Sequence, residues 1–83
     1  MTSYRIVLMK PAQKFIERQE RSHQERLLTA IYKLPHEGDI KPLTGQTNVY
    51  RLRIGNYRVI FSIQNELLIV EVMTIGNRGD IYK

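Results

Sequence analysis

The chain has 83 residues, which is enough for one domain with one small hydrophobic core. Its hydrophobic fraction of 42% is ordinary for a globular protein and too high for simple disorder. The formal net charge of +5 favours acidic partners such as nucleic acid, although many small proteins are basic for solubility alone.

The sequence contains no cysteine, which excludes disulfides and cysteine-based zinc sites. No apolar run approaches the length of a membrane span, and Met1-Thr2-Ser3-Tyr4 shows no signal-peptide pattern. We therefore expect a cytoplasmic protein that does not associate with a membrane.

The first half of the chain predicts one strand and two helices. Residues 4–9 alternate as a short strand does, and Pro11 suits the first turn of a helix because its missing N–H costs nothing there. Ser22-His23-Gln24-Glu25 matches a capping box, which predicts the start of a second helix. Pro35 should end that helix. The two helices are expected to form an antiparallel hairpin joined near Arg21.

The second half predicts a turn-rich connection and then a meander of strands. Prolines and glycines mark residues 35–48 as the connection. Gly55-Asn56 is a two-residue hairpin signal with glycine first, as a type II′ turn prefers, and Asn65-Glu66 is the predicted second turn. Three strands follow from these boundaries: residues 49–54, 57–63 and 67–75.

Helices and strands that are kept apart along a chain indicate an α+β fold, here over residues 1–83 as a single domain. The predicted order is β-α-α-β-β-β, with a helix hairpin packed on one face of a small, mainly antiparallel sheet. How the first strand joins the sheet stays open. Strand alternation assigns eight residues to the face under the helices: Tyr50, Leu52, Ile54, Val59, Phe61, Ile63, Val70 and Val72.

The other face of the predicted sheet carries arginines. Arg51 and Arg53 alternate with the apolar residues of one strand, and the Gly55-Asn56 turn pairs Arg53 with Arg58 on the same face. Like charges directly opposite each other destabilise a sheet, so we expect the site to bind an anion. Phosphate is the natural candidate because guanidinium binds it through two parallel hydrogen bonds. The alternative is a solvated basic face without a ligand.

The second predicted turn sets what lies beside these arginines. With Asn65-Glu66 at the turn, Arg58 lies opposite Met73, and the chain continues past the end of the sheet towards Arg78. Arg78 should then run close to Arg53 and Arg58. The sequence thus predicts a cluster of three or four arginines around one concave patch.

Four other side chains carry groups that are capable of chemistry. Glu71 falls on the arginine-bearing face opposite Ile60, where an ion pair with an arginine is expected and a role as a base is the alternative. Tyr82 has a ring that can stack on a base, although a terminal tyrosine is commonly a packing residue. His23 and His36 are expected on the surface. No close set of metal ligands and no Gly-rich phosphate loop is present, so we predict no metal and no cofactor.

These segments together resemble the RelE branch of the RelE/ParE toxin superfamily, from bacterial and archaeal toxin–antitoxin modules. The resemblance covers essentially the whole chain, and the order and spacing of its segments are specific. The segments are the first strand, the helix hairpin, Lys41-Pro42-Leu43 with Gly45, Tyr50-Arg51-Leu52-Arg53, Gly55-Asn56-Tyr57-Arg58, and Ile75-Gly76-Asn77-Arg78 to Ile81-Tyr82.

The resemblance implies a ribosome-dependent, metal-independent messenger-RNA endonuclease that cuts the codon in the ribosomal A site and inhibits translation. The ribose 2′-hydroxyl attacks the adjacent phosphate and leaves a 2′,3′-cyclic phosphate and a 5′-hydroxyl. By resemblance, Arg58 binds the phosphate, Arg78 is linked to leaving-group protonation, and Tyr82 orients the message. Arg51 and Arg53 take the two basic positions of the preceding strand.

One departure from the family concerns the general base. Some relatives carry lysine where this chain has Arg51 and Arg53, and arginine hardly deprotonates near neutral pH. The base is therefore left open, while arginine can still stabilise developing negative charge.

The resemblance also implies partners. We expect an acidic, DNA-binding, RelB-like antitoxin that wraps the helix hairpin and masks or distorts the basic face, besides the ribosome and messenger RNA. Neither a membrane nor a small-molecule cofactor is expected. Two alternatives stay open: a non-enzymatic ParE-like gyrase inhibitor that shares the fold, and a plain RNA- or protein-binding module.

Overall fold

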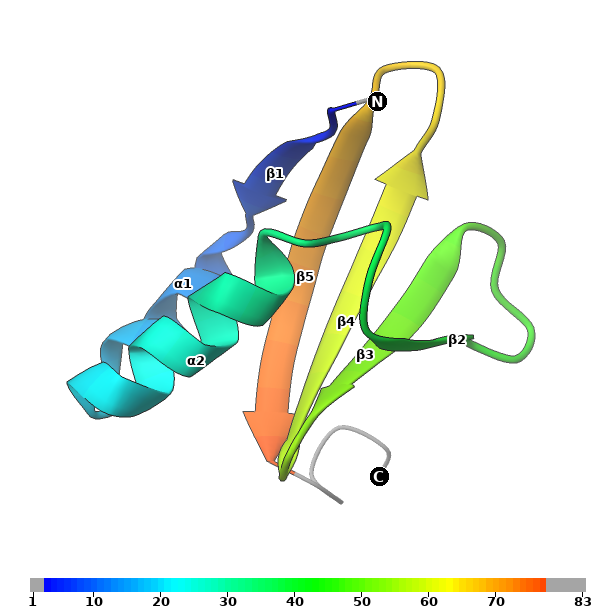
Figure 1. Ribbon diagram of the computed structural model, residues 1–83. Helices are drawn as coiled ribbons and strands as arrows, with labels where there is room; N and C mark the ends of the chain where they lie inside the picture. Colours follow the sequence, from blue (N-terminus) through cyan, green and yellow to red (C-terminus); the bar gives the residue numbers. More distant parts are fainter. Residues whose placement is uncertain (1–2, 78–83) are drawn as a thin grey trace.

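The computed structural model describes residues 3–77, which form two helices and five strands (Figure 1). The α+β class and the order of helices and strands are as predicted, with one strand added between the helices and the meander. In chain order the elements are β1 (Arg5–Leu8), α1 (Lys10–Glu17), α2 (Arg21–Ile31), β2 (Asp39–Pro42), β3 (Val49–Ile54), β4 (Tyr57–Gln64) and β5 (Ile69–Asn77).

The five strands form one sheet in the order β1-β5-β4-β3-β2. Strand β1 pairs with β5 in parallel, and every other neighbouring pair is antiparallel. Two parallel strands need a long crossover connection between them. The helix hairpin is part of the connection between β1 and β5, and it lies on one face of the sheet (Figure 1). This pairing answers the question that the sequence left open about the first strand.

The core lies between the helices and one face of the sheet. The strand residues predicted for this face are confirmed: six are buried, and Tyr50 and Ile63 are partly buried against the core. From the helices, Ala12, Ile16, Leu27 and Ile31 meet them. Burying such side chains is the main stabilisation available to a chain of this size.

The structure corrects the connection predicted over residues 35–48. Within it, β2 pairs with β3 at the edge of the sheet, so that Asp39 lies opposite Arg53 and Pro42 opposite Tyr50. A proline is tolerated at an edge because the N–H it lacks would face away from the sheet. A four-residue strand that ends in proline carries too little alternation to be seen in the sequence.

The second turn of the meander was also predicted wrongly. Gln64 pairs with Ile69, so the loop holds residues 65–68, and the register shifts once more between Ile60 and Phe61. Leu68 takes a left-handed backbone conformation with φ 54°, which leucine rarely adopts and which its residue type therefore does not predict. As a result Arg58 lies opposite Gly76 rather than Met73.

The helix ends differ from prediction at two points. Helix α2 begins at Arg21 after Glu20, with no side-chain cap, so the capping box at Ser22 is wrong. The carbonyl of Glu20 instead accepts the backbone N–H groups of residues 23 and 24, which already places Ser22 inside the first turn. The helix ends at Ile31, before Pro35. Pro11 lies in the first turn of α1, as expected.

Candidate functional site

A row of paired residues crosses the sheet close to the β3–β4 turn. Asp39 of β2 pairs with Arg53 of β3, Arg53 pairs with Arg58 of β4, and Arg58 pairs with Gly76 of β5. Paired residues project to the same face of a sheet. These four residues, named here the arginine row, therefore bring one carboxylate and two guanidinium groups together on the face away from the helices.

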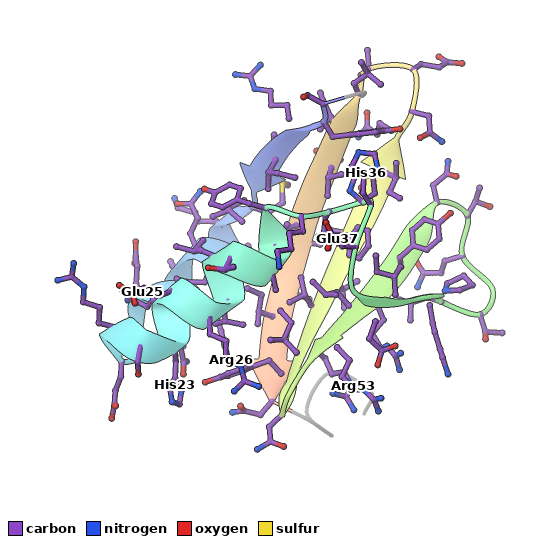
Figure 2. The ribbon with its side chains drawn as sticks, viewed as in Figure 1. His23, Glu25, Arg26, His36, Glu37 and Arg53 are labelled. Carbon is purple, nitrogen blue, oxygen red and sulfur yellow. The ribbon has the colours of Figure 1, made fainter. Side chains whose placement is uncertain are left out.

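The β3–β4 turn fixes the register of the row. Gly55 has φ +56° and Asn56 does not have a positive φ, which agrees with the predicted type II′ turn. The predicted pairs Ile54–Tyr57 and Arg53–Arg58 are confirmed. A Cβ at Gly55 would lie 2.6 Å from Nη2 of Arg26, so this arginine of helix α2 reaches the β3–β4 turn from the helix side of the sheet. Figure 2 shows Arg26 and Arg53 on opposite sides of the hairpin end.

Asp39 gathers two of the predicted arginines. Its Oδ2 accepts a hydrogen bond from Nε of Arg53 at 2.7 Å, and its Oδ1 accepts one from Nη2 of Arg51 at 3.4 Å. The Asp39 side chain stays 38% exposed, whereas that of Arg51 is only 17% exposed. Sequence reasoning missed Asp39 because only the pairing of β2 with β3 brings it to the arginines.

Arg58 is buried, with 6% of its surface exposed. Its Nη1 donates to the backbone carbonyl of Tyr57 at 3.2 Å, and within residues 3–77 it has no carboxylate partner. A guanidinium has five N–H donors, so most of its hydrogen-bonding capacity is unused among these residues. A charge that is withdrawn from water without an opposite charge is costly, which favours an anionic ligand at this position.

A buried donor without a partner lies on the same face. Nε of Arg51 is buried and has no hydrogen-bond partner within the described part of the chain. Buried polar groups are normally paired, so an orphaned donor is a feature that needs an explanation. An anion on this face would have donors from Arg51, Arg53 and Arg58 around it.

The predicted site residues thus fall into two groups. The structure brings Arg51, Arg53 and Arg58 to one face of the sheet. Arg78 and Tyr82 lie outside the described residues, so their predicted places in the cluster stay predictions.

Glu71 lies on the face away from the helices, as predicted, but its predicted position opposite Ile60 and its ion pair with an arginine are wrong. Its Oε1 accepts hydrogen bonds from Ser62 and Gln64, and it makes no ion pair with an arginine among residues 3–77. The reason is the register of β5, which places Glu71 opposite Ser62 rather than opposite Ile60. Glu71 is therefore displaced along the sheet from the arginine row.

On the helix side, the polar contacts tie the helices to the sheet. The hydroxyl of Tyr57 donates to Oε1 of Gln19 at 3.1 Å and lies 2.7 Å from Nδ1 of His23. His36 packs its ring edge-on to Tyr4 at 5.7 Å. In the part of the chain that is described, no three His, Asp or Glu side chains are grouped to hold a metal, and no helix is long and apolar enough to cross a membrane.

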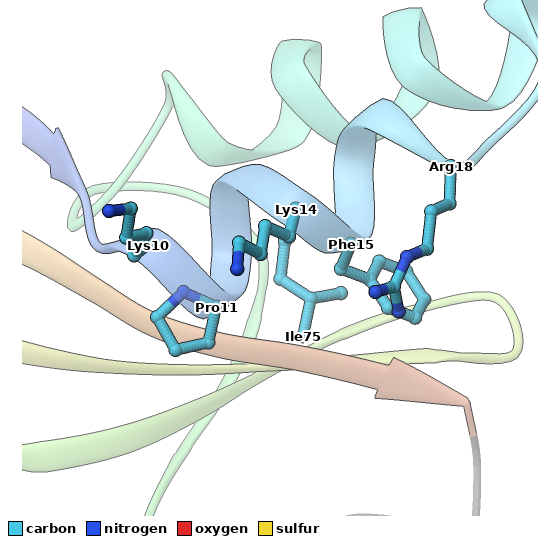
Figure 3. A pocket seen from close by; sticks show the side chains of 6 residues that line it. All are labelled: Lys10, Pro11, Lys14, Phe15, Arg18 and Ile75. Atoms are coloured by element: carbon cyan, nitrogen blue, oxygen red, sulfur yellow. The ribbon is translucent and has the colours of Figure 1, made fainter.

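A second basic surface lies between α1 and β5. An open groove of about 360 Å³ has Pro11, Phe15 and Ile75 as its apolar wall (Figure 3). Three cations, Lys10, Lys14 and Arg18, border it at four-residue spacing, which places them on one side of a helix. The groove lies on the helix side of the sheet, so it is separate from the arginine row.

Comparison with known proteins identifies a toxin family. A family model described as the ParE toxin of the type II toxin–antitoxin system, parDE, matches residues 6–82. No curated protein sequence matches the chain.

Solved structures of toxins share the fold. The archaeal RelE–RelB complex of Pyrococcus horikoshii OT3 contains a chain with 25% identity and a TM-score of 0.75, and the match covers 95% of this chain and 99% of that one. The toxin–antitoxin complex RelBE2 of Mycobacterium tuberculosis gives 20% identity and a TM-score of 0.81, covering 96% and 97%. The isolated E. coli RelE toxin gives 21% and 0.73, covering 96% and 92%.

Proposed function

The chain belongs to the ParE toxin family of type II toxin–antitoxin systems, within the RelE/ParE superfamily, and we propose that it is a ribosome-dependent messenger-RNA endonuclease. The observation that carries this proposal is the arginine row, in which Arg53 and the buried Arg58 are paired neighbours on the sheet face away from the helices. The likeness to RelE toxins, with one relative at 25% identity over nearly the whole of both chains, supports it.

The proposed chemistry uses the arginines to stabilise charge. When the 2′-hydroxyl attacks the adjacent phosphate, negative charge grows on the non-bridging oxygens. Donors already fixed around those oxygens lower the barrier, and such stabilisation is usually the largest catalytic contribution. Arg58 would hold the phosphate through a two-pronged contact, and Arg51 and Arg53 would flank it. Arg78 is proposed for protonation of the leaving 5′-oxygen and Tyr82 for stacking on the message.

The proposed partner is a cognate, RelB-like antitoxin. The similar Pyrococcus toxin was solved as a RelE–RelB complex. Here an open groove of about 290 Å³ beside β1, α1 and α2 has Leu8, Ile16, Leu28 and Tyr32 as its apolar lining, with Gln13 and Glu17 as its polar lining, and Tyr32 is 62% exposed. An apolar groove of this kind fits an amphipathic segment of a partner, so Tyr32→Asp should weaken co-purification with the antitoxin.

Primer extension tests the proposed activity. Purified protein is added to a message in the presence and absence of programmed ribosomes. We expect cuts within the A-site codon only when ribosomes are present, and far slower cutting with Arg58→Ala. Arg5→Ala is the matched control, because Arg5 is an exposed arginine on the edge strand β1. Intact message with the wild-type protein would overturn the proposal.

A second candidate is a ParE-like inhibitor of gyrase, and the family model that matches the chain favours it. It predicts accumulation of gyrase–DNA cleavage complexes while the message stays whole. The third reading, a binding module without toxicity, predicts normal growth of a bacterial host that expresses soluble, folded protein. The three outcomes exclude one another.

A further inference from the structure

The proposed reaction needs a proton acceptor, which the arginines cannot supply. The attacking 2′-hydroxyl must lose a proton, and a guanidinium does not deprotonate in proteins. Arg51, Arg53 and Arg58 are therefore donors only. Within residues 3–77, the carboxylate that contacts guanidinium groups of this face is that of Asp39.

Asp39 lies at one end of the arginine row, on the edge strand β2. Along the row, Asp39 and Arg58 flank Arg53, each one strand away from it. Neighbouring strands are roughly 4.8 Å apart, so the Asp39 and Arg58 backbones are separated by about 10 Å, with the Arg53 side chain between them. A phosphate held by Arg53 and Arg58 would thus have a carboxylate beside it on the same face.

The carboxylate of Asp39 has acceptor capacity left for a substrate. A carboxylate offers about four lone-pair sites, and the two hydrogen bonds from Arg51 and Arg53 take one on each oxygen. The Asp39 side chain is also 38% exposed, so a ribose hydroxyl can reach it. The two arginines hold the carboxylate in a fixed orientation, as a base requires.

We propose that Asp39 is the general base of the cleavage reaction, an assignment that rests on the proposed function. The Asp39 carboxylate takes the proton of the 2′-hydroxyl while the 2′-oxygen forms a bond to phosphorus. The bond from phosphorus to the 5′-oxygen breaks, and that oxygen takes up a proton from an acid of the site or from water. Asp39 then returns its proton to solvent, so the protein is unchanged.

The competing role for Asp39 is structural: it keeps Arg51 and Arg53 from repelling each other. Asp39→Asn separates the two roles. The amide keeps an oxygen that accepts from Arg53, so the row can stay in place, but it cannot accept a proton as a carboxylate does. Asp39→Glu keeps the carboxylate. Glu37→Gln is the matched control, because Glu37 is exposed and only two residues away (Figure 2).

The experiment measures single-turnover cleavage of ribosome-bound message from pH 6 to pH 8.5, with thermal unfolding and binding to ribosomes measured alongside. The charged groups that face Asp39 are Arg51 and Arg53 of β3, Lys41 of its own strand and Arg58 of β4, and none of them is altered in these variants. General bases contribute about 10²- to 10⁴-fold, so Asp39→Asn should be slower by that factor at equal folding and binding.

The pH profile distinguishes a base from a positioning residue. In Asp39→Asn only hydroxide remains to take the proton, so its rate should rise about tenfold per pH unit, whereas the wild-type and Asp39→Glu profiles should be shallower. A uniform loss with the wild-type profile, or an undiminished rate, overturns the assignment while the proposed function stands. Wild-type protein that leaves the message intact overturns the proposed function, and the assignment with it.

Discussion

Arg58 offers the sharpest test of how the sheet binds phosphate. Arg58→Lys keeps the positive charge but replaces a rigid two-pronged donor with a single point charge. Hydrogen bonds to charged groups contribute about 1.5–3 kcal/mol each, so the loss of one prong should slow cleavage roughly 10- to 100-fold. Arg58→Ala loses both prongs, and the loss should be on the order of 10²- to 10⁴-fold.

Arg58→Ala should leave the fold intact. Arg58 is 6% exposed and has no carboxylate partner among residues 3–77, so its burial already carries a desolvation cost. Removing that cost offsets part of the packing lost with the side chain, and we expect Arg58→Ala to stay folded, with a free energy of unfolding lowered by no more than about 3 kcal/mol.

The assay is single-turnover primer extension on ribosome-bound message, with urea unfolding of each variant. Arg5→Ala, at the exposed first residue of the edge strand β1, should cleave at the wild-type rate. If Arg58→Ala cleaves within threefold of wild type while folded, Arg58 does not hold the reacting phosphate. If Arg58→Lys is as fast as wild type, the two-pronged geometry has no role.

Three further predictions concern stability, each measured by urea unfolding. Phe61→Ala should cost about 3–5 kcal/mol because Phe61 is fully buried in the core, and a cost under about 1 kcal/mol would contradict its place there. Tyr57→Phe should cost about 1 kcal/mol because it removes the hydroxyl that contacts Gln19 and His23, and an unchanged midpoint would mean that those contacts are not stabilising. Gly55→Ala should cost about 1–2 kcal/mol because its φ is +56° and Arg26 must move aside, and a more stable variant would show that the turn relaxes.

The sequence predicted the parts of the fold that depend on local signals. Gly55-Asn56 fixed the β3–β4 register, and the alternation of Leu52 with Arg53 separated the buried face from the arginine-bearing one. These features follow from turn chemistry and from the two-residue period of a strand, both of which are read within a few residues. The convergence of Arg53 and Arg58 was therefore within reach of sequence reasoning.

The parts that failed depend on contacts between distant segments. Asp39 belongs to a four-residue edge strand that exists because it pairs with β3, and the residues next to Asp39 in the sequence do not predict this pairing. The register of β5 depends on Leu68 in a left-handed conformation and on an irregularity at Ile60 and Phe61. Such shifts are decided by packing of the whole sheet rather than by residue type. The carboxylate beside the arginines was missed for this reason.

The central claim is that the arginine row holds an RNA phosphate while the adjacent 2′-hydroxyl attacks it. The most direct measurement is the chemical identity of the ends formed when wild-type protein meets a ribosome-bound message. We predict a 2′,3′-cyclic phosphate on the upstream fragment and a 5′-hydroxyl on the downstream fragment, both formed far more slowly by Arg58→Ala. Fragments with a 3′-hydroxyl and a 5′-phosphate, or an intact message, would contradict the claim.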